Sequence, residues 1–153
     1  MAFQLCSSAF EPDQRIPKKY TCEGLDVSVP LSWTEIPAGT KSLALIADDP
    51  DAPGGTWVHW VLYDLPASLP HLSEGLPGKE TLENGAKQGI NDFRRLGYGG
   101  PCPPPGPVHR YFFKLYALDR MTGLPPRATK RQLLEAIKGH TLGEAQLVGV
   151  YSR

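Results

Sequence analysis

The sequence lacks any run of apolar residues approaching the ~20 that a membrane-spanning helix needs, so no integral membrane association is expected. It also lacks an excess of either charge, with 16 Lys and Arg against 16 Asp and Glu in 153 residues. Nucleic acids and anionic membrane surfaces select clustered positive charge, so neither is an expected partner. The G-x-S-x-G turn of serine hydrolases and the P-loop of nucleotide triphosphatases are both absent, which removes two common enzyme templates.

Cysteine is scarce, with only Cys6, Cys22 and Cys102 in the chain. Three cysteines cannot all pair, and none of them forms a C-x-x-C motif. The first residues lack the basic region and the apolar run of a signal peptide, and no N-x-[ST] glycosylation acceptor occurs. We therefore expect free thiols and a cytoplasmic protein.

Glycine and proline are abundant, at 16 residues each, which is typical of short strands joined by rigid turns. Five segments have the β-branched, aromatic or apolar character of strands: 31–33, 42–47, 56–65, 109–118 and 146–151. The segments 42–47 and 56–65 are nearly continuous apolar runs, as expected for strands covered on both faces. The pattern predicts a mostly β protein.

One helix is predicted near the C-terminus. Thr129 can cap its first turn, and Leu133, Leu134 and Ile137 then share one apolar face. Gly139 would end it, because glycine is favoured just past a helix terminus. No repeat and no long linker divides the chain, so residues 1–153 are expected to form a single domain.

Two loops carry residues suited to chemistry. The first, 48–55, places three aspartates among two prolines and two glycines directly after an apolar strand, and its Ala52–Pro53 bond is a candidate for a cis peptide. The second, 97–106, has glycines whose backbone N–H groups could line an anion site, followed by prolines that stiffen it. Taken alone, each loop also has an ordinary structural explanation. The first could be an acidic turn that points into solvent, and the second a rigid surface loop.

The loops and the strands beside them together resemble the phosphatidylethanolamine-binding protein family, including its bacterial Raf-kinase-inhibitor-like branch. The resemblance runs from about Phe3 to Tyr151 and rests on six segments: 49–53 (DPDAP), 57–60 (WVHW), 97–106 (GYGGPCPPPG), 109–111 (HRY), 20–24 (YTCEG) and 31–33 (LSW). It implies a β-sandwich with a few short peripheral helices and a small anion pocket at one end. The implied ligand is phosphate or a phosphoryl head group, with no cofactor and no metal.

The same resemblance implies the residues of the pocket, which are Asp49, Asp51, His59, Gly99, Gly100, Pro101, His109 and Tyr111. A carboxylate alone would repel a bound anion, so an aspartate in the pocket must have another role. We expect Asp49 or Asp51 to accept the N–H of His59. That contact would favour the protonated ring, whose other N–H then donates to the anion. Backbone N–H groups near Gly99 and Gly100 would add donors. Without the resemblance, His59 would be taken as a core residue of its strand. Tyr111 could instead be a core aromatic, because it lies in an alternating strand.

Other functions stay open at this stage. The pocket could read a phosphorylated residue on a protein partner, and inhibition of kinases and proteases is a theme of the family. Two histidines and two carboxylates include suitable metal ligands, although no close spacing preorganises them. Cys102 with His109 would be the nucleophile and base of a hydrolase. A homodimer is also possible, since strand-rich chains can pair through their faces or edges.

Overall fold

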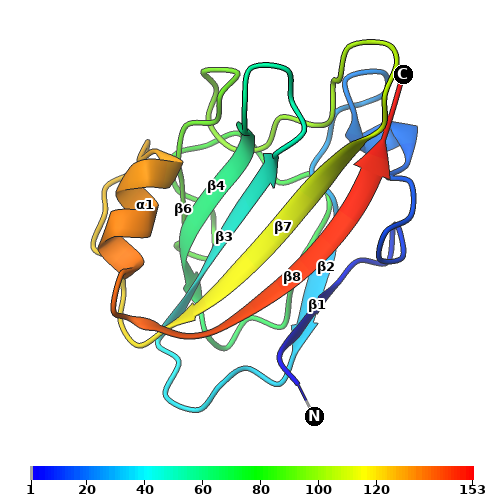
Figure 1. Cartoon of the computed structure of the whole chain (residues 1–153). Coiled ribbons are helices and arrows are strands. Elements are labelled where there is room, and N and C mark those ends of the chain that lie inside the picture. Colours follow the sequence, from blue (N-terminus) through cyan, green and yellow to red (C-terminus); the bar gives the residue numbers. More distant parts are fainter. Residues whose placement is uncertain (1) are drawn as a thin grey trace.

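The computed structural model describes residues 2–153 and places the chain in two antiparallel sheets with one short helix against the larger sheet (Figure 1). The elements in chain order are β1 (Gln4–Cys6), the 3-10 helix η1 (Lys18–Tyr20), β2 (Leu31–Thr34), β3 (Ser42–Asp49), β4 (Trp57–Pro66), β5 (His71–Leu72), β6 (Lys87–Gln88), β7 (His109–Leu118), α1 (Lys130–Ile137) and β8 (Thr141–Tyr151). The smaller sheet has the order β1-β2-β5 and the larger one β6-β4-β3-β7-β8. The predicted mostly β sandwich fold is confirmed.

Strand β3 lies at the centre of the larger sheet, and all eight of its residues are buried. Side chains alternate between the two faces of a strand. Leu43, Leu45 and Ala47 accordingly join the main core between the sheets, whereas Ala44 and Ile46 join a second cluster that includes residues of α1. Burial on both faces is the reason that this strand reads as a continuous apolar run.

Helix α1 has the predicted cap, in which Thr129 Oγ1 accepts from Gln132 N while the Gln132 side chain accepts from Thr129 N. Leu133 and Ile137 are buried against the sheet, but Leu134 is 38% exposed and does not belong to the buried face. The predicted three-residue apolar face was therefore too wide. In the described part of the chain, no helix is long or apolar enough to cross a membrane.

The expectation of free thiols was wrong. Cys22 and Cys102 form a disulfide, and only Cys6 is a free thiol, exposed on β1. With two of the three thiols paired, the cysteines no longer favour a reducing compartment. Residues 2–153 contain no cis peptide bond, so Ala52–Pro53 is trans.

Candidate functional site

A small pocket lies at the end of the larger sheet where β3 ends and where β4 and β7 begin. Its volume is about 180 Å³, and its walls are Asp49, Ala52, Pro53, Trp57, His59, Phe93, Cys102, Pro103, Pro104, His109 and Tyr111. The antiparallel register creates this arrangement: Asp49 pairs with Trp57 of β4, and Asp48 pairs with Phe112 of β7. The chain's C-terminus lies at the same end of the molecule (Figure 1).

Asp49 and His109 form a buried pair within the pocket. The Nδ1 atom of His109 lies 2.7 Å from Asp49 Oδ2, while Asp49 Oδ1 accepts the backbone N–H of Asp51 at 2.7 Å. A carboxylate only accepts, so Nδ1 of His109 carries the proton. The Nε2 atom then carries a lone pair and accepts hydrogen bonds in the neutral ring, and it carries a proton and donates in the protonated ring.

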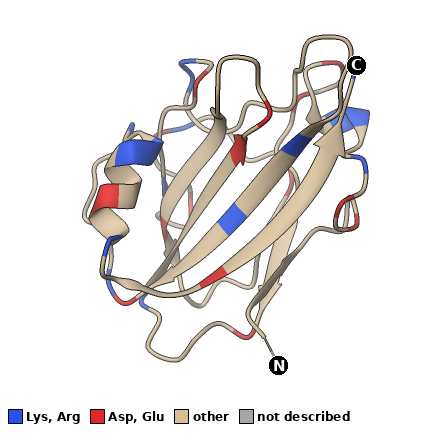
Figure 2. Ribbon diagram, in the orientation of Figure 1, with Lys and Arg blue, Asp and Glu red and all other residues tan. Residues whose placement is uncertain are grey.

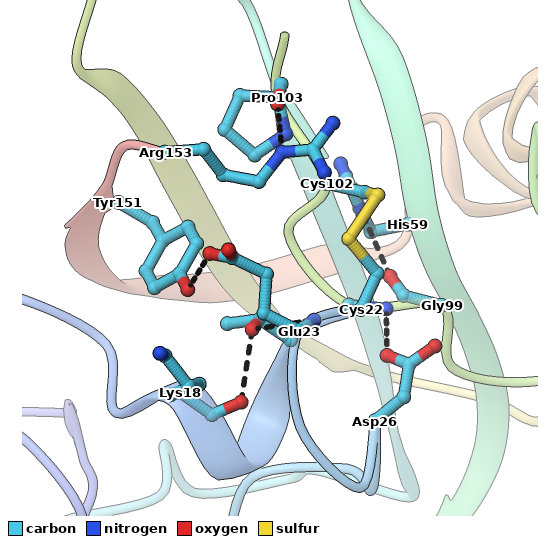
Figure 3. Close-up of a disulfide and its surroundings, with 12 residues drawn as sticks. Lys18, Cys22, Glu23, Asp26, His59, Gly99, Cys102, Pro103, Tyr151 and Arg153 are labelled. Atoms are coloured by element: carbon cyan, nitrogen blue, oxygen red, sulfur yellow. Dashed lines mark hydrogen bonds between the residues drawn. A yellow bond between two sulfur atoms is a disulfide. The ribbon is translucent and has the colours of Figure 1, made fainter. Parts of the chain in front are cut away.

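His59 is held differently from our prediction. Its Nδ1 atom lies 2.6 Å from the carbonyl oxygen of Gly99 (Figure 3), not beside Asp49 or Asp51. Its ring stacks edge-to-face against Phe93 and Tyr111, with centroids 5.4 Å and 5.2 Å away. Burial lowers the pKa of His59 below its ordinary value of 6.5, against smaller raising effects from the Gly99 hydrogen bond and from Asp49. The free protein therefore favours a neutral His59.

Tyr111 presents the most unusual group in the pocket. Its hydroxyl is the only buried side-chain polar atom without a hydrogen-bond partner in residues 2–153. His59 and His109 line the same pocket, and their ring hydrogen bonds are made from Nδ1. Burial, and then the negative charge of Asp49, raise the pKa of Tyr111, so the hydroxyl stays protonated and can donate.

Asp51 lies outside the pocket and binds Arg110. The Nε and Nη2 atoms of Arg110 each lie 2.9 Å from a carboxylate oxygen of Asp51, and these hydrogen bonds lower the pKa of Asp51 to about 2. The pair lines a neighbouring surface hollow together with Pro107 and Val108. Its contribution to the pocket is indirect, through the hydrogen bond from its backbone to Asp49.

Gly99, Gly100 and Pro101, which were predicted to line the pocket, do not line it. The N–H of Gly99 donates to His59 O at 2.9 Å and that of Gly100 donates to Asp26 Oδ1 at 2.8 Å, so the predicted backbone donors are already used. Pro101 O accepts the N–H of Cys22. Glycine is required at Gly100 because a Cβ atom would lie 2.1 Å from Tyr20 O.

The disulfide crosses the wall of the pocket, joining the segment after η1 to the loop before β7 (Figure 3). Cys102 faces the cavity, but its sulfur is bonded to Cys22 and cannot act as a thiolate nucleophile in this state. The Cys102/His109 hydrolase alternative is therefore wrong for the disulfide-bonded protein. In residues 2–153, no three His, Cys, Asp or Glu side chains cluster in a way that suits a metal ion.

The structure adds pocket residues that sequence reasoning did not single out. Trp57, 39% exposed, and Phe93 form an aromatic wall in edge-to-face contact, with centroids 5.4 Å apart. Pro103 and Pro104, from the loop before β7, also line the pocket. Trp57 belongs to the WVHW segment on which the family resemblance rests, so the sequence could have indicated that it lines the pocket. Nothing in the sequence around Phe93 indicated this.

Lys and Arg are interspersed with Asp and Glu along the ribbon (Figure 2). Several charges are paired across the structure. Lys130 Nζ binds Asp48 Oδ2 at 2.6 Å, and Lys87 Nζ lies 3.3 Å from Asp64 Oδ2. Within residues 2–153, the one buried side-chain polar atom without a partner, the Tyr111 hydroxyl, belongs to a residue that lines the pocket.

Comparison with known proteins places this chain among relatives of similar length. A family model described as phosphatidylethanolamine-binding protein matches residues 6–152. A UPF0098 protein of Methanothermobacter thermautotrophicus is 53% identical over 97% of this chain and 98% of its own, and one of Aquifex aeolicus is 49% identical over 98% and 88%.

Solved structures agree with these sequence matches. A putative phosphatidylethanolamine-binding protein homolog from Chlamydia trachomatis has a TM-score of 0.91 at 43% identity, covering 99% of this chain and 98% of its own. YbcL of E. coli, described as a member of the mammalian family, has a TM-score of 0.93 at 31% identity, covering 100% and 99%. This chain belongs to the phosphatidylethanolamine-binding protein family.

Proposed function

We propose that this protein binds a small anion, such as phosphate or the phosphoryl group of a larger molecule, in the pocket. The carrying observation is that the buried Tyr111 hydroxyl has no partner, while His59 and His109, whose hydrogen bonds are made from Nδ1, line the same cavity as Tyr111. Buried polar groups in native proteins are nearly always hydrogen-bonded, and an orphan such as the Tyr111 hydroxyl calls for an explanation. A tetrahedral anion accepts hydrogen bonds from all three groups at once.

Protons accompany the anion in this proposal. Both Nδ1 atoms donate, to Gly99 O and to Asp49, so each Nε2 atom becomes a donor only when its ring is protonated. A bound anion favours the protonated rings, because an opposite charge nearby stabilises the charged form. Anion binding should therefore take up protons, and affinity should fall as the pH rises from 5 to 8.

The size of the pocket supports a small ligand. Its volume of about 180 Å³ lies below the range of roughly 300–1,000 Å³ that is typical of sites for drug-sized molecules. A phosphoryl group fits inside, and the remainder of a larger ligand would extend along Trp57 and the proline wall. The sulfur of Cys102 is held in the disulfide, so it is not available as a thiolate nucleophile. The proposed role is binding rather than turnover.

A second candidate is recognition of a phosphorylated residue on a protein partner. Trp57 is 39% exposed beside the pocket, and Val108, in the adjacent hollow, is 57% exposed. Exposed apolar side chains around a polar site are suited to contact with a second macromolecule. A phosphoserine peptide that binds more tightly than free phosphate, and is displaced by it, would favour this candidate.

Isothermal titration calorimetry at pH 6 with phosphate and with phosphoethanolamine tests the proposal. We expect saturable heat for the wild type, loss of that heat for His59→Ala, and no loss for the control His71→Ala, whose side chain is exposed on β5. A titration with sulfate, whose charge is constant from pH 5 to 8, isolates the protonation of the protein. Absence of heat in the wild type, or a sulfate affinity independent of pH, would contradict the proposal.

A further inference from the structure

The charges of the pocket do not by themselves favour an anion. Asp49 contributes a buried negative charge, and His109 is paired with it. Burial lowers the pKa of His59, which makes its positive form costly. The nearby Arg110 is occupied by Asp51 on the outer surface. An anion in this pocket needs a further positive charge.

Arg153 is a cation held to one of the residues that line the pocket. It follows β8, whose Tyr151 pairs with His109 at the start of β7. Its Nε atom donates to the carbonyl oxygen of Pro103 at 2.5 Å, and Pro103 lines the pocket (Figure 3). Its own backbone oxygen accepts the N–H of Gly106 at 3.1 Å. The side chain is thereby held against the loop that forms the proline wall.

The guanidinium group keeps free donors in this position. Arg153 has no ion pair with a side-chain carboxylate in residues 2–153, and its two Nη groups have no hydrogen-bond partner there. Its positive charge acts on the Tyr111 hydroxyl: it tends to lower the pKa of Tyr111, against the larger effects of burial and of Asp49. The cation is therefore close enough to affect the orphan hydroxyl.

We propose that Arg153 is a ligand-binding residue that supplies the positive charge for the bound anion and makes the pocket prefer dianions to monoanions. This inference rests on the proposed function of the pocket. The planar guanidinium matches the oxygens of a phosphoryl group, and its charge does not titrate in the physiological range. The residue thus complements the two histidines, whose Nε2 atoms donate only when the ring is protonated.

The test compares sulfate, a dianion, with acetate, a monoanion, by calorimetry at pH 7 on wild type, Arg153→Gln and Arg153→Lys. Arg15→Gln is the matched control, because the Arg15 guanidinium lies over the Tyr151 ring at 4.3 Å and its Nη2 atom donates to Ser152 O. We expect Arg153→Gln to weaken sulfate binding by about tenfold or more, as for loss of a charge-assisted hydrogen bond. Acetate binding should weaken less, Arg153→Lys should recover part of the sulfate affinity, and Arg15→Gln should bind as the wild type.

A purely structural role for Arg153 makes a different prediction. Loss of the contact with Pro103 would loosen the loop and weaken both anions equally, leaving the ratio of sulfate to acetate affinity unchanged. That result, or an equal loss in Arg15→Gln, would overturn the inference while leaving anion binding intact. A wild-type protein that binds neither anion would overturn the proposed function, and the role of Arg153 with it.

Discussion

Removal of the Cys22–Cys102 disulfide is expected to destabilise the protein by about 4 kcal/mol. The two cysteines are 80 residues apart in the sequence, so the bond restricts a large part of the unfolded chain. In the chain-entropy treatment a closed loop of this length contributes about 4–5 kcal/mol at 25 °C. The free energy of unfolding of a single domain is typically about 5–15 kcal/mol, so the expected loss is a large fraction of the stability.

The folded structure should nevertheless survive the loss of the bond. Three hydrogen bonds join the same two segments: Cys22 N–H to Pro101 O, Gly100 N–H to Asp26 Oδ1, and the Tyr98 hydroxyl to Tyr20 O. These contacts hold the wall of the pocket in place independently of the sulfur atoms. The effect should therefore arise mainly in the unfolded state.

Urea unfolding of a Cys22→Ser/Cys102→Ser variant measures this loss. Both proteins should carry Cys6→Ser, because Cys6 is an exposed free thiol that could exchange with the disulfide. For a slope of about 2 kcal/mol/M, the midpoint should fall by about 2 M. The disulfide-intact protein treated with a reducing agent should match the double variant. A midpoint shift below about 0.5 M at unchanged slope would refute the entropic reasoning.

Three further substitutions test the buried groups. Tyr111→Phe should leave the urea midpoint unchanged or slightly raised, because the hydroxyl is buried without an acceptor, yet weaken phosphate binding several-fold in calorimetry. The pKa of His59 is lower in the folded state than its ordinary value of 6.5, so the unfolded chain binds the extra proton and stability should fall as the pH drops below about 6.5. His59→Gln should reduce the difference between urea midpoints at pH 7 and pH 5, and an unchanged difference would contradict this assignment. Gly100→Ala should cost about 1–3 kcal/mol by thermal unfolding, because its Cβ would collide with Tyr20 O, whereas Gly54→Ala, with open space around it, should cost far less.

Long elements of the fold were predictable from local pattern. The strands over 42–49, 57–66 and 109–118 appeared as apolar or alternating segments, and the helix was indicated by its cap at Thr129. Strands β1, β5 and β6 contain only two or three residues, too few to show a period of two. They exist because neighbouring strands offer hydrogen-bonding edges, which is information that a local segment does not contain.

Pocket residues were predictable through motifs rather than through spacing. Of the eight residues that the family resemblance implied, Asp49, His59, His109 and Tyr111 line one cavity, whereas Asp51, Gly99, Gly100 and Pro101 do not. The contacts among them were not predictable, and the carboxylate of Asp49 binds His109 rather than His59. Strand register decides this outcome, since a shift of one residue moves every side chain to the opposite face.

By itself, the sequence determined the family, the main strands, the capped helix and the residue types that meet in the pocket. Tertiary structure alone decided which distant groups pair: Asp49 with His109 across 60 residues, Cys22 with Cys102 across 80, and Arg153 with Pro103 across 50. The physical reason is range. Propensity, capping and apolar periodicity act within a few residues, whereas hydrogen bonds and disulfides between distant segments depend on distances of a few ångströms that only the packed sheets define.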